Sequence, residues 1–206
     1  MSNSSINSNG SVGVLSSGTD TGTIVGNGGN ISTLEVTNTG IEIDGIVNSN
    51  GILNVYNGGT VSNITINTGG SLTAGTMTPS SSTGATAFIL GGTISSATIM
   101  LENGALASGI SAQDKASIFV MSGAEVNSAT ISSSNIIVYD GAVVSGGSLS
   151  LSSTETLYST SYDENFSGNS VQNIESGGLS FSANFTDTSN TQFIKADGIA
   201  SGTTTH

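Results

Sequence analysis

The feature that most constrains this chain is a short unit that recurs along it. Each copy has an apolar strand, a turn of the form x-Gly-Gly or x-Gly-Ala, and a second strand with alternating apolar residues. Clear copies span 57–66, 90–99 and 122–131, with intermediate copies at 68–72 and 103–106. The repeat is roughly 11–22 residues long, and a unit of that length cannot enclose a core of its own.

Stacking such units solves this problem, because each coil covers the apolar face of the coil below and pairs its backbone with it. We therefore predict an all-β fold, a single-stranded parallel β-helix (β-solenoid) of short irregular coils. About nine or ten coils at the spacing of strands in a sheet would form a rod on the order of 45 Å long. A meander or β-sandwich is the main rival, because Asn-Gly and Asp-Gly pairs also favour hairpins.

Glycine is expected where the chain turns from one face of a coil to the next, because such corners often need a positive φ. The glycines that we assign to structural turns are Gly28, Gly29, Gly58, Gly59, Gly69, Gly70, Gly91, Gly92, Gly123, Gly141, Gly177 and Gly178.

The composition fits stacked strands better than disorder. Ser, Thr, Asn and Gly make up 113 of the 206 residues, but 33 Ile and Val residues supply β-branched apolar side chains. Helix-forming residues are scarce, so we expect at most one helical turn, near 112–116. We divide the chain into an N-terminal capping or frayed segment (1–20), a β-solenoid repeat domain (21–200) and a linker or tag remnant (201–206).

Charge and residue types exclude several kinds of function. The net charge is −12, with two lysines and no arginine, so nucleic-acid binding is not expected. No run of about 18 apolar residues occurs, so no membrane insertion of this segment is expected. The chain has no cysteine and one histidine. We therefore predict no metal site, no cofactor and no disulfide.

Catalysis is not expected either. The single histidine is the last residue, and Lys115 and Lys195 lie in different repeats. A carbohydrate-processing β-helix would need clustered carboxylates. Of the acids, Asp163 and Glu164 are adjacent, which we interpret as a solvated loop. Glu42 and Asp44 alternate, which we interpret as one outward strand face beside a turn. We predict no catalytic residue; three or more acids in one groove would instead favour an enzyme.

A rod lined with Ser, Thr and Asn offers a long hydrogen-bonding face rather than a pocket. Identical rods can associate along such a face through many weak contacts. Ser122, Ser145 and Ser176 are candidate O-glycosylation acceptors, because we expect them at turns.

The segments 57–70 (NGGTVSNITINTGG), 90–99 and 122–131 resemble the passenger repeats of AIDA-type self-associating autotransporter adhesins of Gram-negative bacteria. The resemblance covers roughly residues 24–185. It implies a right-handed β-helix, a location outside the cell or on the bacterial surface, self-association or adhesion, and in some members heptosylated serines.

The expected function is therefore that of a non-catalytic extracellular β-solenoid that mediates cell-surface adhesion or self-association. Its expected partners are further copies of itself, or glycans or proteins of host or bacterial surfaces. One alternative is a carbohydrate-binding or carbohydrate-processing β-helix. A second alternative is a passive stalk or spacer ahead of another module.

Overall fold

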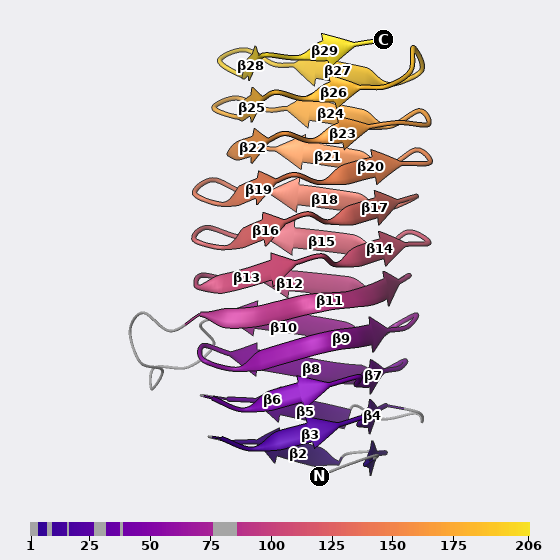
Figure 1. Ribbon diagram of the computed structural model, residues 1–206, viewed down its shortest axis with the longest axis vertical. Coiled ribbons are helices and arrows are strands. Elements are labelled where there is room, and N and C mark those ends of the chain that lie inside the picture. Colours follow the sequence, from indigo (N-terminus) through magenta and orange to yellow (C-terminus); the bar gives the residue numbers. More distant parts are fainter. Residues whose placement is uncertain (1–3, 8–9, 16, 27–31, 38, 76–85) are drawn as a thin grey trace.

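The computed structural model describes residues 4–7, 10–15, 17–26, 32–37, 39–75 and 86–206. These residues form ten stacked coils of parallel strands, with the two termini at opposite ends of the stack (Figure 1). Each coil passes in the same order through three faces. The predicted β-solenoid is confirmed.

The first face is a ten-stranded parallel sheet with one strand from every coil; it lies behind the other two faces in Figure 1. Its strands are β2 (Ser11–Val14), β5 (Ser32–Val36), β8 (Gly51–Tyr56), β10 (Ser71–Gly75), β12 (Thr98–Leu101), β15 (Ser117–Val120), β18 (Asn135–Val138), β21 (Thr154–Leu157), β24 (Val171–Ile174) and β27 (Thr191–Ile194). We number the coils from 1, which begins at β2, to 10, which begins at β27.

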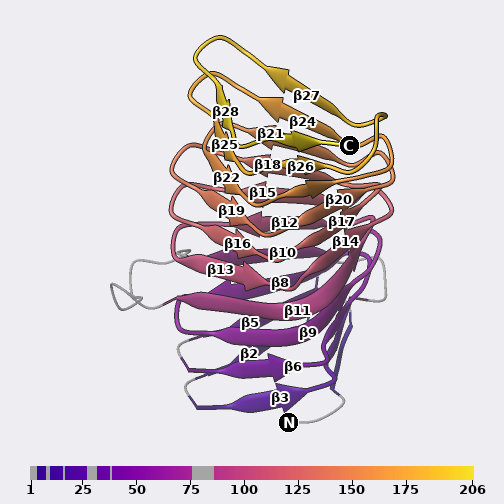
Figure 2. The same ribbon diagram turned by 45° about the horizontal axis from the view of Figure 1, so that its top comes forward.

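The second and third faces are the two halves of a bent 19-stranded parallel sheet. The second face contains β3 (Thr19–Thr21), β6 (Ile41–Ile43), β13 (Ala105–Ser108), β16 (Glu125–Asn127), β19 (Val143–Ser145), β22 (Thr160–Tyr162), β25 (Leu179–Phe181) and β28 (Ile199–Ser201). The third face contains β1 (Ser5–Ile6), β4 (Ile24–Val25), β7 (Ile46–Val47), β14 (Ser111–Gln113), β17 (Thr130–Ser132), β20 (Ser148–Ser150), β23 (Asn165–Phe166), β26 (Asn184–Phe185) and β29 (Thr204–Thr205). Strands β9 (Thr60–Ile66) and β11 (Ala87–Ser95) run through both faces, and the bend is seen in Figure 2.

The coils extend into both segments that we expected to lie outside them. Strands β1 and β2 lie within residues 1–20, yet β1 pairs with β4 and β2 pairs with β5 of the stack. At the other end, β29 pairs with β26 within residues 201–206.

The described residues include no helix, so none of them forms a helix able to cross a membrane. The predicted helical turn near 112–116 is wrong. Its residues form the end of β14 and a turn at Asp114 and Lys115, whose φ angles are 56° and 68°. Consecutive residues in the left-handed region cannot continue a right-handed helix.

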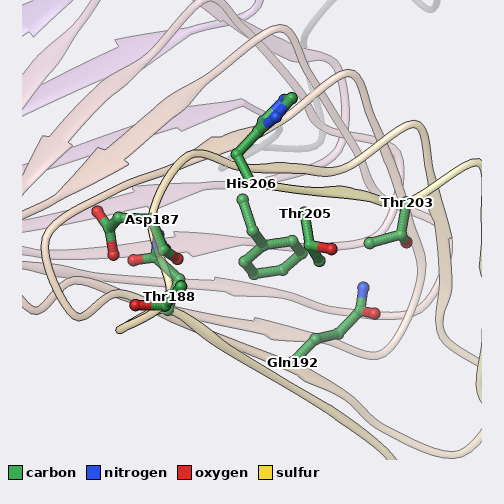
Figure 3. Close-up of a pocket in the computed structure, with 8 residues that line it drawn as sticks. Asp187, Thr188, Gln192, Thr203, Thr205 and His206 are labelled. Carbon is green, nitrogen blue, oxygen red and sulfur yellow. The ribbon is translucent and has the colours of Figure 1, made fainter.

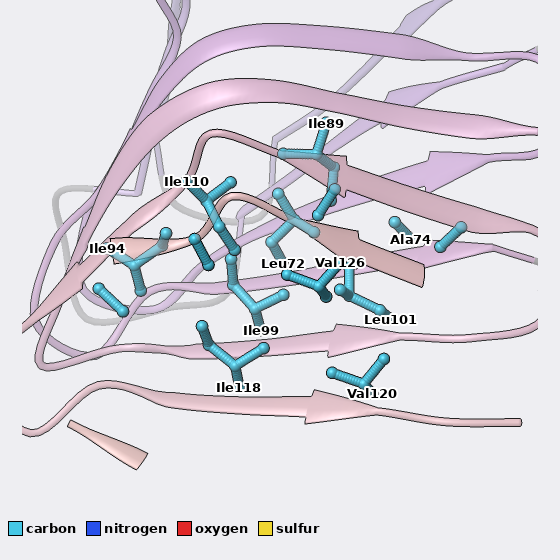
Figure 4. Close-up of a cluster of buried hydrophobic side chains, with 14 of the residues drawn as sticks. Leu72, Ala74, Ile89, Ile94, Ile99, Leu101, Ile110, Ile118, Val120 and Val126 are labelled. Carbon is cyan, nitrogen blue, oxygen red and sulfur yellow. The ribbon is translucent and has the colours of Figure 1, made fainter. Parts of the chain in front are cut away.

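Columns of aliphatic side chains fill the interior (Figure 4). On the first face, parallel pairing places Leu53, Leu72, Ile99, Ile118 and Ile136 directly one above another, and each is at most 1% exposed. Ile94 of the third face and Val126 of the second face belong to the same cluster. Each such side chain contributes roughly 1.5–3 kcal/mol by burial.

One corner has the same backbone conformation in all ten coils. Where the second face meets the third, one residue per coil has a φ between 54° and 71°. These residues are Gly22, Asp44, Asn63, Gly91, Gly109, Ser128, Gly146, Asp163, Ser182 and Gly202. The backbone N–H of Ser128 donates to Ser145 of the next coil at 2.8 Å, and that of Asp163 donates to Phe181 at 2.9 Å. The left-handed residue therefore bends the sheet while its hydrogen bond to the next coil is kept.

The predicted turn glycines have two different roles. Gly58, Gly69, Gly91, Gly92, Gly123, Gly141 and Gly177 have positive φ. Gly59, Gly70 and Gly178 do not, but each lies against the backbone of the preceding coil; a Cβ on Gly178 would stand 2.3 Å from the carbonyl oxygen of Leu157. At these three positions glycine is needed because a side chain would not fit, not because the backbone has a positive φ. Gly28 and Gly29 lie outside the described residues.

We expect Ser128→Val to destabilise the fold by about 1–2 kcal/mol, because a β-branched residue is strained at positive φ. We expect Ser128→Gly to change the free energy of unfolding by less than about 1 kcal/mol, because glycine adopts this φ freely. Urea denaturation of the two variants measures the difference. Equal stability of the two variants would contradict the requirement for a left-handed residue at this corner.

Candidate interaction surface

The fourteen acidic side chains all belong to described residues, and their positions distinguish the three faces. Four point inward: Asp20, Glu42, Glu155 and Glu164. Most of the others lie at corners or in the loop before β27: Asp44, Asp114, Asp140, Asp163, Asp187 and Asp197. Glu35, Glu102 and Glu175 lie on or directly after strands of the first face, and Glu125 points outward from the second. Among the described strands of the third face, none carries an acidic residue.

The third face instead presents a column of neutral hydrogen-bonding side chains, which we call the polar ladder. It has one residue in each of coils 3–10, aligned by the pairing of the strands. Its members are Thr65, Thr93, Ser111, Thr130, Ser148, Asn165, Asn184 and Thr204. All are half-buried or exposed, because alternate residues of a strand face out.

Side chains of the polar ladder bond to one another along the stack. Asn184 Nδ2 donates to Asn165 Oδ1 at 3.1 Å, and Thr204 Oγ1 donates to Asn184 Oδ1 at 2.9 Å. A second outward column lies two residues further along each strand, and Asn67 Nδ2 there donates to Asn48 Oδ1 at 2.8 Å. The third face thus offers rows of donors and acceptors repeated at the spacing of strands, about 4.8 Å.

The three serines proposed as glycosylation acceptors do not lie together. Ser122 and Ser176 are exposed at the corner between the first and second faces, each directly before a glycine with positive φ. Ser145 is not at a turn; it points outward from β19, and its hydroxyl donates to Asn127 Oδ1 at 3.0 Å.

Two of the acids that we expected on the surface are buried. Glu42 is 0% exposed and Glu164 is 1% exposed, whereas their neighbours Asp44 and Asp163 are exposed. For Glu42 the expectation failed because it assumed regular strand alternation, and for Glu164 because the segment interpreted as a loop forms strands β22 and β23 around a corner. Asp44 and Asp163 are left-handed corner residues, so the alternation is interrupted beside both glutamates.

The buried Glu42 lies in a small polar site near the N-terminal end. The N–H of Thr23 donates to Glu42 Oε1 at 3.2 Å, and Thr23 Oγ1 donates to Asp20 Oδ2 at 2.7 Å. Gly45 leaves room for this carboxyl, because a Cβ there would stand 2.7 Å from Glu42 Oε1. Burial raises the pKa of Glu42 to about 7; the Thr23 N–H opposes this rise, and Asp20 adds to it.

The four buried acids lie in the interior rather than in an open groove, with Asp20 and Glu42 in coils 1 and 2 and with Glu155 and Glu164 in coil 8. Among the described residues, no three His, Cys, Asp or Glu side chains gather closely enough to hold a metal ion. A hollow of about 450 Å³ lies at the C-terminal end (Figure 3). Its lining includes Phe185, Gln192, Thr203 and Thr205, which belong to the last two coils. It is therefore the uncovered end of the core, with Asp187 as its single acidic lining residue.

Comparison with solved structures finds a similar fold. The chain is similar to a TibC-catalysed, hyper-glycosylated fragment of TibA, with a TM-score of 0.61 and 19% sequence identity. The alignment covers 100% of this chain and 86% of the TibA fragment. No protein-family model matches the sequence, and no curated protein matches it. The structural likeness supports the β-solenoid fold at this level of identity.

Proposed function

We propose that this chain is a non-catalytic, adhesin-like rod that acts outside the cell or on its surface and associates side by side with further copies through the third face. The observation that carries the proposal is the uncharged polar ladder along eight coils of a chain with net charge −12. Two copies that meet on this face bring no acidic side chain of its strands into contact. The same approach through the first or second face would bring an acidic side chain of its strands, Glu35 or Glu125, into the contact.

Two resemblances support the assignment. The sequence repeats are similar to those of AIDA-type autotransporter adhesin passengers, and the fold is similar to that of the TibA fragment. That fragment is hyper-glycosylated, so Ser122 and Ser176, which are exposed at corners, are reasonable acceptors for a comparable modification here.

Added charge on the polar ladder tests this association. We expect Thr130→Glu with Ser148→Glu to reduce self-association at least tenfold, because both residues are exposed in adjacent coils of the third face. Self-association depends on the sum of many weak contacts along the rod, so disturbing two neighbouring contacts weakens the whole association. Sedimentation velocity over a range of concentrations gives the association constant.

The matched control adds the same charge to another face. Thr98 and Asn135 are exposed outward residues of the first face, so Thr98→Glu with Asn135→Glu should leave association near the wild-type level. If both double variants associate like wild type, the third face is not the contact. If the wild-type chain stays monomeric at high concentration, the proposal of self-association is wrong, and the alternative function as a passive stalk is favoured.

A further inference from the structure

Part of the interior of coils 8 and 9 is polar, at positions that are aliphatic in coils 3–7, whereas Leu157, Phe166 and Ile174 keep the rest of it apolar. The inward column of the first face runs through Ile118, Ile136, Glu155, Gln172 and Gln192, one residue per coil. The inward column of the second face passes from Val144 to Ser161 and then Ser180. Glu164 adds a second buried carboxyl beside the corner of coil 8.

We name Glu155, Ser161, Glu164, Gln172 and Ser180 the lumen cluster; each is at most 1% exposed. Gln172 Nε2 donates to Glu155 Oε2 at 2.7 Å, to Ser180 Oγ at 3.0 Å and to Ser161 Oγ at 3.3 Å. Gln172 Oε1 accepts from Gln192 Nε2 at 2.7 Å. The second oxygen of Glu155, Oε1, is buried without a hydrogen-bond partner.

The fold makes room for the second carboxyl. The N–H of Gly147 donates to Glu164 Oε1 at 3.1 Å, and a Cβ on Gly147 would stand 2.3 Å from Glu164 Oε2. Gly147 has no positive φ, so its small size rather than its backbone conformation is what this site needs. A side chain at position 147 would displace the carboxyl.

Within the part of the chain that the structure describes, no basic side chain forms an ion pair with either of these glutamates. Strand pairing places Ile136 of β18, Val144 of β19 and Gln192 of β27 next to the cluster, and none of them is charged. The charged groups that act on Glu164 are Glu155 and Asp163. The two lysines, Lys115 and Lys195, are exposed, and Lys195 pairs with Glu175 at 2.6 Å.

The electrostatic consequence is that both carboxyls hold protons more tightly than in water. Burial raises the pKa of Glu155, against the hydrogen bond from Gln172. Burial also raises the pKa of Glu164, and repulsion from Glu155 raises it further; the Gly147 N–H opposes this, and Asp163 adds a smaller increase. Removing water from an ionised carboxylate is costly when no opposite charge replaces the water.

We propose that the lumen cluster is a proton-dependent lock on coils 8–10: the coils stay closed while Glu155 and Glu164 carry protons, and they open when both carboxyls are deprotonated. The unfolded chain releases these protons near the ordinary glutamate value, whereas the folded chain keeps them to higher pH. The folded state therefore binds more protons than the unfolded state in that window, and stability falls as the pH rises through it. The limiting slope is a tenfold increase in the unfolding constant per pH unit for each retained proton.

Opening should begin at the C-terminal end. Ile194 and Ile199 of coil 10 are each 52% exposed, so this end buries less apolar surface than the middle of the rod. Coils 8–10 also carry Asn165, Asn184 and Thr204 of the polar ladder, so their opening would remove that end of the third face.

Hydrogen exchange of the full chain, followed by mass spectrometry at pH 6 and pH 9 and corrected for intrinsic exchange rates, tests the lock. We expect peptides from coils 8–10 to lose at least tenfold in protection at pH 9. The Glu155→Gln, Glu164→Gln double variant should keep its protection, because glutamine has the same size and stays neutral. Glu125→Gln, at an exposed acid of β16, should behave like wild type.

Infrared spectroscopy provides a readout that does not require the variant to fold. Wild type should show a protonated-carboxyl band at pH 6 that disappears as the pH is raised. Because burial also raises the pKa of Glu42, the band is measured in Glu42→Gln as well, where the part due to Glu155 and Glu164 should remain. The lock is refuted by wild-type protection that is equal at both pH values, or by absence of this band. An equal loss of protection in a folded double variant, or in Glu164→Gln alone, also refutes it.

Discussion

Replacing Gly92 by alanine should destabilise the rod by at least about 3 kcal/mol, far more than the same change at its neighbour Gly91. Gly92 has a φ of 117°, where residues with a Cβ are strained. Its Cβ would stand 2.3 Å from the carbonyl oxygen of Ile64 and 2.9 Å from the Ile64 nitrogen. Those atoms belong to the backbone of β9, which pairs with β11, so neither strand can move without breaking the ladder.

Gly91→Ala is the matched control. Gly91 also has a positive φ, 68°, but a Cβ there would meet nothing within 4 Å. The expected loss is about 1–2 kcal/mol from backbone strain alone. Urea denaturation followed by circular dichroism measures both variants. If both variants lose the same free energy of unfolding, backbone conformation rather than the close approach of Ile64 explains why position 92 needs glycine.

Phe166→Ala should reduce the free energy of unfolding by about 3–5 kcal/mol. Phe166 is fully buried on β23, and its ring stacks on Phe185 of the next coil with centroids 4.7 Å apart. Removing the ring leaves a cavity between coils and also removes this aromatic contact. Leu149 of the preceding coil lies on the other side of the cavity.

The control for this prediction is an exposed aromatic residue. Phe193 is 56% exposed on the outward side of β27, so Phe193→Ala should cost no more than about 0.5 kcal/mol. Thermal unfolding by calorimetry compares the two variants. A loss at Phe166 as small as that at Phe193 would show that the columns of the core do not carry the stability.

Several features of the fold could be predicted from the sequence because they depend on local chemistry. Short β-branched runs between glycine-bearing turns indicated strands too short to close a core, and parallel stacking followed from that. The register of the repeats could not be predicted. Segments 57–66 and 122–131 begin at the corner between the first and second faces, whereas 90–99 begins one corner later, at Gly91.

The reason is that small residues are needed at all three corners of a coil. Gly59 stands against Val36 at one corner, Gly70 against Val47 at another and Gly92 against Ile64 at the third. Similar turn sequences therefore occur more than once per coil, and the sequence pattern alone cannot tell one corner from another. Glu42 and Glu164 were expected on the surface because the sequence does not show where a corner interrupts a strand and turns the neighbouring side chain inward.

The candidate interaction surface, too, could be predicted from the sequence only in part. The sequence by itself established a chain rich in neutral hydroxyl and amide groups, poor in cations and built from stacked strands. It could not identify a polar ladder, because neighbours such as Thr130 and Ser148 are 18 positions apart and meet only through strand pairing. Which side chains share a face, and which carboxyls lie inside, depend on the number of residues in each coil and on where a left-handed residue interrupts alternation. Only the tertiary structure decides these, because both are properties of the stacked backbone rather than of any one repeat.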